Sequence, residues 1–446
     1  MTTPRSTGQT TTRLVYTRLL PILFLGQLLV CIDRTNISFA ALQMNDDLGV
    51  SAEMFGLAAG IFFLGYALAE VPSNLLLQRV GARRWLGTLV LAWGLVTVVQ
   101  AFVPNPVTFV LLRFLLGLTE GGFLPGVFLF LTYWLPADSR ARAAIVITAA
   151  TPIAAVIGGP LAGLLMHLEV AGLAGWQWLF LVEGIAPVAL ALVWFRVVPS
   201  SPAAARWLPQ VNRDSLLERL AAERDVAARE SHGLSDLVEA LRQKTVWVYS
   251  LAYFVLLLGY YGIFLWLPQI IEAGFSGIST LHNGLLSAVP FIVGLAALAF
   301  FGRTASRTGD RRWHLITFGL VSGAALVLGV LIDVPILAFV ATCVAMGCGT
   351  AYIGLFWASP MAILSGSAAA VGFALVNGIG NLGSFLGPYF AGLLRGASGS
   401  FTLTTLMFAA FLFASAVVPL TFRRLFPNLL RLQESVETLR TERTKP

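Results

Sequence analysis

Six ionisable side chains lie inside long apolar stretches of this sequence, and they are the first sign of chemistry. They are Asp33, Arg34, Glu70, Arg113, Glu120 and Glu183. A charged residue near the centre of a bilayer costs roughly 2.5 kcal/mol or more, so each should face the protein interior or a water-filled cavity. Residues that carry such a cost are candidates for binding or moving ions.

Four of these residues have a spacing that favours one shared site. Asp33 and Arg34 are adjacent, so on a helix they point about 100° apart and each needs a partner on another helix. Arg113 and Glu120 are seven residues apart, which puts them on one helix face, two turns from each other. Bringing the two helices together joins two carboxyls and two guanidiniums in a site whose charges sum to zero.

A site of this kind could couple the uptake of an anion to the uptake of a proton. An entering carboxylate adds negative charge, and protonation of Asp33 or Glu120 would offset it while freeing an arginine for bidentate binding. The alternative is a permanently paired ion network that only holds the helices together.

The composition indicates that these residues lie on membrane-spanning helices. The chain has 446 residues, of which 57% are hydrophobic and 11% charged, against about 25% charged in soluble domains. Apolar stretches close to the roughly 20 residues that cross a bilayer recur along nearly the whole chain. We predict an all-α membrane protein with twelve spans, near residues 19–41, 54–77, 84–103, 107–134, 142–167, 176–198, 246–272, 281–301, 313–332, 336–358, 368–393 and 402–424.

The basic residues favour a topology with both termini in the cytoplasm. Of the 29 Lys and Arg residues, all but Arg34, Arg113 and Arg395 fall in segments or span ends that this topology makes cytoplasmic, as the positive-inside rule requires. The net charge of +7 belongs to these loops. Lipid is therefore the expected surrounding, nucleic acid is not an expected partner, and we expect a monomer.

A repeat at an offset of 228 residues divides the chain into two halves. The run RVGARRW from Arg79 returns as RTGDRRW from Arg307, and Gly159-Pro160 returns as Gly387-Pro388. Parallel repeats of six helices occur in transporters that open alternately to the two sides of a membrane. We predict two pseudo-symmetric six-helix bundles, at 1–198 and 246–446, with a cytoplasmic linker with surface helices at 199–245.

The two basic turns resemble the signature loop of the major facilitator superfamily. Two positions depart from that signature, because Asn74 and Gln78 stand where it usually has Gly and Asp. The resemblance implies a gating loop in each half, formed by Arg79, Gly81, Arg83, Arg84, Arg307, Gly309 and Arg311.

A narrower resemblance spans nearly the whole chain. The runs DRTN from Asp33, FFLGY from Phe62, RFLLGLTEGGFLPG from Arg113 and NGIGNLG from Asn377 are similar to the anion:cation symporter family. Within it, bacterial carriers described as tartrate, phthalate or hydroxyphenylacetate transporters are closest. The resemblance implies the bacterial inner membrane, proton sites at Asp33 and Glu120, Arg34 as the anchor of the substrate carboxylate, Arg113 as regulator of Glu120, and a substrate contact at Tyr66.

Further candidates carry weaker signals. Tyr66, Glu70 and Asn74 recur every four residues and form a polar stripe, in which Glu70 is as compatible with a gate as with a packing hydrogen bond. Glu183 follows two tryptophans, Trp176 and Trp178, and we expect a structural role for it.

The second half offers an amide pair and several aromatic residues. Asn377 and Asn381 are four residues apart and could bind substrate hydroxyls or a carboxylate, although neighbouring glycines suit close helix packing equally well. Tyr261 could belong to an apolar wall for a ring substrate.

These features predict a secondary active transporter that takes up a small organic carboxylate with protons by alternating access. The alternatives are an anion exchanger or uniporter, and a drug:proton antiporter of the same superfamily, against which the two in-span arginines argue because they would repel cationic drugs. The four histidines show no catalytic or metal-ligand spacing. We therefore expect neither an enzyme nor a cofactor nor a metal.

Overall fold

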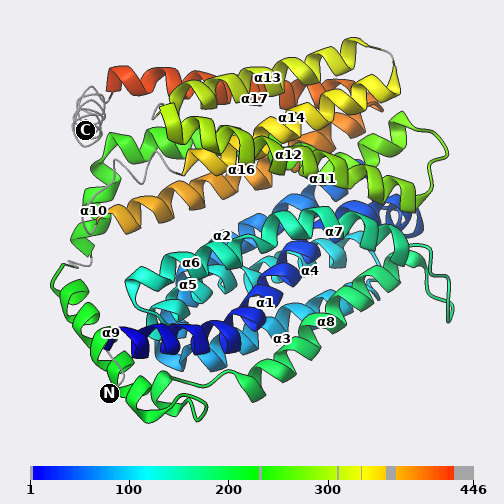
Figure 1. Ribbon diagram of the computed structural model, residues 1–446. Helices are drawn as coiled ribbons and strands as arrows, with labels where there is room; N and C mark the ends of the chain where they lie inside the picture. The colour runs from blue at the N-terminus through cyan, green and yellow to red at the C-terminus, as the bar shows by residue number, and fades with distance from the viewer. Residues whose placement is uncertain (1–3, 231–233, 309–310, 333, 358–367, 426–446) are drawn as a thin grey trace. The chain divides into compact units, whose positions relative to one another are not determined.

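A computed structural model describes residues 4–230, 234–308, 311–332, 334–357 and 368–425 (Figure 1). Its elements are almost entirely helices, and the described residues contain no strand beyond an isolated bridge between Val170 and Leu173. The elements are α1 (Pro4–Leu48), α2 (Ala52–Val80), α3 (Ala82–Gln100), α4 (Pro106–Glu120), α5 (Phe123–Trp134), α6 (Ala137–Thr148), α7 (Ala150–Leu165), α8 (Gly175–Val197), η1 (Pro202–Ala204), α9 (Gln210–Glu230), α10 (Leu234–Arg242), α11 (Lys244–Gly274), α12 (Thr280–Thr308), α13 (Arg312–Leu331), α14 (Pro335–Phe356), α16 (Ala368–Ser398) and α17 (Thr402–Leu425).

Eleven stretches of the described chain are long and apolar enough to cross a membrane. Each overlaps a predicted span, and the remaining predicted span, 368–393, corresponds to α16. This helix has 31 residues, more than the roughly 20 needed to cross a bilayer, but Asn377, Asn381 and its glycines make it less apolar. The prediction of an all-helical, polytopic membrane protein is confirmed.

Several helices differ from the predicted spans, and α12, for example, ends at Thr308 instead of near residue 301. Helix α1 has 45 residues and starts well before the predicted residue 19, because hydropathy marks only the apolar part of a helix. The span predicted at 107–134 consists of α4 and α5, separated by Gly121 and Gly122. The span predicted at 142–167 begins earlier and consists of α6 and α7, separated by Ala149.

The chain folds into two compact units. Unit 1 comprises Met1–Ser231 and Leu267–Ala288, and unit 2 comprises His232–Trp266 and Val289–Pro446. The two helices of the predicted linker divide between the units, since α9 belongs to unit 1 and α10 to unit 2.

The sequence repeat has a counterpart in the helices. Helix α12 begins and ends 228 residues after α2, and both helices have 29 residues. The basic turns therefore follow two helices of equal length, as expected if the halves arose from one ancestral unit.

Within unit 1, glycines let α2 and α4 pack backbone against backbone. A Cβ on Gly117 would lie 2.0 Å from the carbonyl oxygen of Phe62, and one on Gly65 would lie 2.4 Å from that of Phe114. Small residues allow such close approach between membrane helices. This contact fixes Phe62, and Tyr66 one turn further, beside the charged residues of α4.

Helix α1 packs against α7 and α8, and α3 packs against α4 and α8. Side chains of α1 can therefore contact side chains of α7 and α8 within unit 1. Within unit 2, α13 contacts α14 and α17, and α10 contacts α16.

Helix α9 docks on the end of unit 1 at which α1 starts, which we call the linker end. Asn212 of α9 donates a hydrogen bond to the Thr11 hydroxyl at 2.8 Å, and Arg140 pairs with Glu223 at 2.9 Å. The indoles of Trp134 and Trp207 stack with their centroids 5.9 Å apart. These contacts tie the first part of the linker to the α5–α6 junction.

Candidate functional site

The four charged residues of helices α1 and α4 meet inside unit 1. Arg34 and Glu120 form an ion pair with 3.2 Å between Nε and Oε2. Asp33 and Arg113 interact electrostatically with each other, and Arg113 also interacts with Glu120. The structure thus joins two carboxyls and two guanidiniums, one of each kind from each helix.

Asp33 is held by neutral hydrogen-bond donors. The Thr97 hydroxyl of α3 donates to Oδ2 at 2.8 Å, and the Asn36 amide of α1 donates to Oδ1. All three side chains are buried. Sequence reasoning missed Thr97, because a threonine in an apolar helix ordinarily bonds the backbone of its own helix and gives no signal.

Arg113 acts on Glu120 through its electrostatic field, without an ion pair between the two among the described residues. Its side chain is buried, and its Nε and Nη1 atoms have no hydrogen-bond partner among the described residues. The guanidinium lies over the ring of Phe62, with its Cζ 5.1 Å from the ring centroid. The partner of Glu120 is Arg34, and Arg113 is held by the field of both acids and by an aromatic face.

Two aromatic rings of α2 support the guanidinium of Arg34. Its Cζ lies 4.6 Å from the ring centroid of Tyr66 and 5.6 Å from that of Phe62. Phe62 therefore contacts both arginines of the cluster. A guanidinium over an aromatic face is stabilised by about 0.5–2 kcal/mol, the larger value applying away from water.

The members of the cluster differ in their exposure. The side chain of Arg34 is 18% exposed, whereas its partner Glu120 is fully buried, and Asp33 and Arg113 are buried as well. Glu120 also has one oxygen, Oε1, without a hydrogen-bond partner in the described part of the chain. Arg34 is therefore the member of the cluster that solvent can reach, and it is bound to the buried carboxyl of Glu120.

Glu183 of α8 belongs to the same site, which the sequence did not suggest. Its side chain is 6% exposed, hydrogen-bonds Asn36 and interacts electrostatically with Asp33. The signal that could have found it is the acid itself in the middle of an apolar helix. The neighbouring tryptophans, Trp176 and Trp178, indicate a packing role instead.

The remaining polar residues of α2 lie on the same helix as Tyr66. Glu70 is half-buried and interacts electrostatically with Tyr66, and Asn74 is half-buried one turn further. They form a polar stripe that leads from the cluster toward the linker end, where α2 ends at Val80.

In unit 2, the amide pair and the glycines of α16 lie on different parts of the helix. Cβ atoms on Gly383 and Gly387 would lie 2.3 and 2.2 Å from backbone oxygens of α11, so these glycines serve close packing. Asn377 and Asn381 lie on a different face of α16 from Gly383 and Gly387, and both are half-buried. Tyr261 of α11 is half-buried too, with its ring 5.8 Å from Tyr260 and 5.5 Å from Phe264.

The first basic turn joins helices of unit 1. Gly81 has a φ of 91° between α2 and α3, a conformation that glycine adopts without strain. Arg83 donates to the carbonyl oxygen of Phe195, and the Trp194 indole donates to the carbonyl oxygen of Arg83 at 3.0 Å. Arg83 thus ties α3 to α8, whereas Arg79 and Arg84 are exposed.

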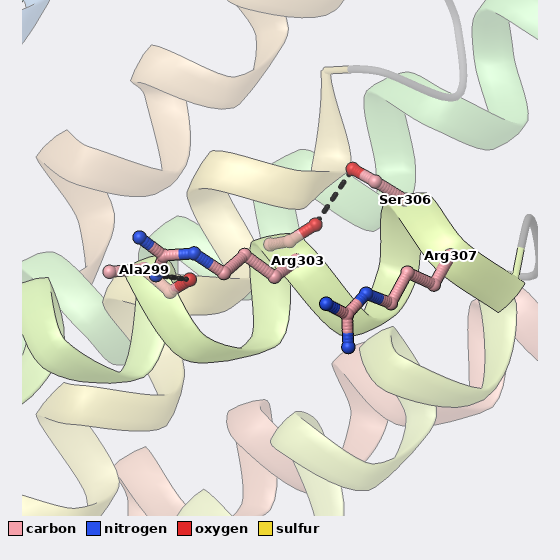
Figure 2. Close-up of a pocket in the computed structure, with 5 residues that line it drawn as sticks. Ala299, Arg303, Ser306 and Arg307 are labelled. Atoms are coloured by element: carbon pink, nitrogen blue, oxygen red, sulfur yellow. Dashed lines mark hydrogen bonds between the residues drawn. The ribbon is translucent and has the colours of Figure 1, made fainter.

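The second basic turn follows a shallow pocket on α12, shown in Figure 2. Arg303 lies back along the helix and donates to the carbonyl oxygen of Ala299 at 2.8 Å. Gly309 lies outside the described residues, and Arg311 precedes the first residue of α13. None of the buried charged residues lines this pocket, which is formed by Ala299, Gly302, Arg303, Ser306 and Arg307.

Comparison with known proteins decides the family. The sequence profile of the Major Facilitator Superfamily matches residues 23–388 of the chain. The chain belongs to the Major Facilitator Superfamily. A protein of Agrobacterium vitis named "Putative tartrate transporter" is 39% identical over 420 residues, which are 93% of this chain and 95% of the relative. A "Quinolone resistance transporter" of Acinetobacter baumannii is 39% identical over 389 residues, 87% of this chain and 89% of the relative.

A solved structure shows the same fold. The bacterial homolog of the human lysosomal transporter Spinster superposes with a TM-score of 0.76 at 18% identity, over 92% of this chain and 97% of that one. Two predictions are thereby confirmed, the superfamily and its fold. As a superfamily member, the protein is a multi-pass membrane transporter and not an enzyme.

Proposed function

We propose that this transporter takes up a small organic carboxylate together with protons. The observation that carries the proposal is the Arg34–Glu120 pair, in which a partly exposed guanidinium is bound to a fully buried carboxyl at 3.2 Å. Arg34 can offer its planar fork to a carboxylate from the accessible side, while Glu120 can hold a proton on the buried side. Asp33 is the second proton site of the proposal.

The coupling follows from the charge balance around Arg34. When Glu120 is ionised, it competes with the substrate carboxylate for the guanidinium. A proton on Glu120 removes this competition, so binding of the proton raises the affinity for the substrate, and binding of the substrate raises the affinity for the proton. Release reverses the order, because loss of the proton restores the ion pair and displaces the substrate.

The relatives support a carboxylate as the substrate class. The relative in Agrobacterium vitis is named for tartrate, which carries two carboxylates and two hydroxyls. In our proposal Arg34 binds one carboxylate with Tyr66 as a neighbouring contact, and Arg113 regulates Glu120 through the electrostatic field that both acids share. Asn377, Asn381 and Tyr261 are proposed substrate contacts from the second half of the repeat.

We further propose that the protein lies in a bacterial inner membrane with both termini in the cytoplasm. The distribution of Lys and Arg supports this orientation. The linker end is then the cytoplasmic end, and the repeated halves, 1–198 and 246–446, open alternately to either side with the basic turns as gates. We expect the monomer to be the working unit.

Transport by purified protein in liposomes tests the proposal, with labelled tartrate as the probe. The liposome interior is set one pH unit more alkaline than the outside, and the membrane potential is held at zero. Tartrate should then accumulate inside about tenfold for each coupled proton. Substrate added without a gradient should raise the external pH. Uptake that is saturable but insensitive to the gradient would identify a uniporter or exchanger instead.

A drug:proton antiporter is the second candidate, because one relative is named for quinolone resistance. The two candidates predict opposite directions of movement. Cells that carry the transporter should retain more labelled tartrate if it is a symporter, and should retain less quinolone if it is an exporter. Thermal-shift screening of the purified protein against both compounds gives an independent reading, since a ligand that binds the folded state raises its stability.

A further inference from the structure

Glu183 is a buried acid that has no basic partner in the described part of the chain. Its Oε2 has no hydrogen-bond partner among the described residues, although the side chain is only 6% exposed. An ionised carboxylate in such a position would be costly, because buried charges are ordinarily paired or neutralised.

The helices packed on α8 supply one charged neighbour. Helix α1 presents Asp33 and the Asn36 amide to Glu183. The charged residues of α3 are Arg83 and Arg84 in its first turn at the linker end, and α7 contains no charged residue. The field at Glu183 is thus that of another acid, with Asn36 between the two.

The full cluster contains three acids and two guanidiniums. The acids are Asp33, Glu120 and Glu183, and the guanidiniums are those of Arg34 and Arg113. The four-residue site expected from the sequence has a charge of zero, but the site with Glu183 carries one excess negative charge when all acids are ionised. One resident proton restores neutrality before any substrate enters.

The geometry points to Glu183 as a third proton-carrying residue, which holds the resident proton and exchanges it with Asp33. Glu120 has Arg34 as its partner at 3.2 Å, and Asp33 has the field of Arg113 and two hydrogen-bond donors. Glu183 has neither. The Asn36 side chain, which donates to Asp33 Oδ1, also hydrogen-bonds Glu183 and so links the two carboxyls.

The exchange conserves charge within the cluster. An O–H bond breaks at Glu183 and one forms at the Asp33 carboxylate, so the negative charge moves from Asp33 to Glu183. Asn36 lies one turn beyond Asp33 on α1, away from the linker end, and Glu183 lies in the half of α8 that is also away from it. In the orientation proposed above, Glu183 is on the external side of Asp33, where protons enter. The inference rests on the proposed symport.

The decisive variant is Glu183→Gln, compared with wild type in liposomes with labelled tartrate. The amide keeps the size of the side chain and a hydrogen bond to Asn36 but carries no exchangeable carboxyl proton. We expect normal folding and counterflow, while accumulation driven by a one-unit pH gradient falls from about tenfold per proton to about one. Glu272→Gln, which changes an acid of α11 outside the cluster, is the matched control and should accumulate like wild type.

Each outcome has one meaning. If wild type does not accumulate substrate, the proposed symport fails and Glu183 is not involved. If wild type and Glu183→Gln accumulate equally, Glu183 only packs and the inference is overturned. Loss of counterflow by a folded Glu183→Gln protein would overturn it too, because the residue would then serve reorientation.

A second variant covers the case in which Glu183→Gln does not fold. Glu183→Asp keeps the carboxyl and should retain pH-driven accumulation, with a dependence of initial rate on external pH displaced from that of wild type. An unchanged pH profile would contradict a proton-carrying role.

Discussion

Arg34 and Glu120 are bound to each other at 3.2 Å between Nε and Oε2, and only the arginine is accessible. The ion pair therefore connects the buried carboxyl of Glu120 with a guanidinium that a molecule in solution can reach. Breaking a buried pair by removing one partner costs about 3–5 kcal/mol, because a charge remains uncompensated. Protonation of Glu120 avoids that cost, since it removes the charge that needs compensation.

Arg34→Lys should fold normally but lose most of its transport. Lysine keeps the positive charge for Glu120 but lacks the planar fork that binds a carboxylate bidentately. We expect the substrate KM to rise at least about tenfold, which corresponds to about 1.4 kcal/mol, close to the lower end of the roughly 1.5–3 kcal/mol that a hydrogen bond to a charged group contributes. The measurement is initial uptake by protein whose thermal stability matches wild type. Arg303→Lys, which changes an exposed arginine of α12, is the control. Near-normal uptake by Arg34→Ala would remove Arg34 from the site.

Glu120→Gln should separate transport from proton coupling. The neutral amide imitates a permanently protonated acid and leaves Arg34 available to the substrate. Counterflow, which needs only the loaded carrier to reorient, should persist at least in part. Accumulation driven by a pH gradient should collapse, because the empty carrier has no proton to release at this position. The comparison of both assays in liposomes checks the prediction, and undiminished accumulation would leave Asp33 or Glu183 as the essential proton carrier.

Phe62→Leu should weaken substrate binding without removing any charge. The ring lies under both arginines, at 5.6 Å from Arg34 and 5.1 Å from Arg113. Loss of two such contacts removes roughly 1–4 kcal/mol of stabilisation from the guanidiniums, so Arg34 should become less ordered and KM should rise. Phe109→Leu, which changes a buried ring of α4 that packs on Phe180, is the matched control. If the two variants have the same KM, the aromatic support is unimportant for binding.

Gly117→Ala and Gly378→Ala should differ strongly in their effect on folding. The added Cβ at Gly117 would lie 2.0 Å from the Phe62 carbonyl oxygen, whereas one at Gly378 would meet no atom within 4 Å. Gly117→Ala must separate α2 from α4, and we expect loss of folded protein or a large fall in thermal stability. Gly378→Ala should fold at least as well as wild type, because alanine favours a helix over glycine by about 1 kcal/mol. Detergent thermal melts check both, and similar stabilities would contradict the α2–α4 packing.

Much of the fold could be predicted because hydropathy and the repeat are local properties of the sequence. The run RVGARRW located the turn between α2 and α3, and its second copy located the turn after α12. Helix lengths outside the apolar core could not be predicted in the same way. The first 15 residues of α1 before Leu19 are polar or mixed, and their helix is supported by contacts such as Asn212 with Thr11.

The site was only partly predictable, because it depends on how each helix is rotated about its axis. The spacing of Arg113 and Glu120 put both on one face, and the adjacency of Asp33 and Arg34 required two separate partners. The identity of those partners needs tertiary structure. Arg34 takes Glu120, and Asp33 takes Thr97 from α3 and Asn36 from its own helix. Glu183 could be recognised as costly but not assigned to the cluster.

The interleaving of the two units has a consequence for biosynthesis. Unit 1 takes its first segment from residues up to Ser231 and its last from Leu267–Ala288, so it stays incomplete while the chain in between is made. At synthesis rates of about 5–20 residues per second, the ribosome needs roughly 3 to 11 s to go from Ser231 to Ala288. During that time, a nascent chain released after α9 would lack part of its first folding unit. Fragments cut at the linker should therefore need to be expressed together to accumulate.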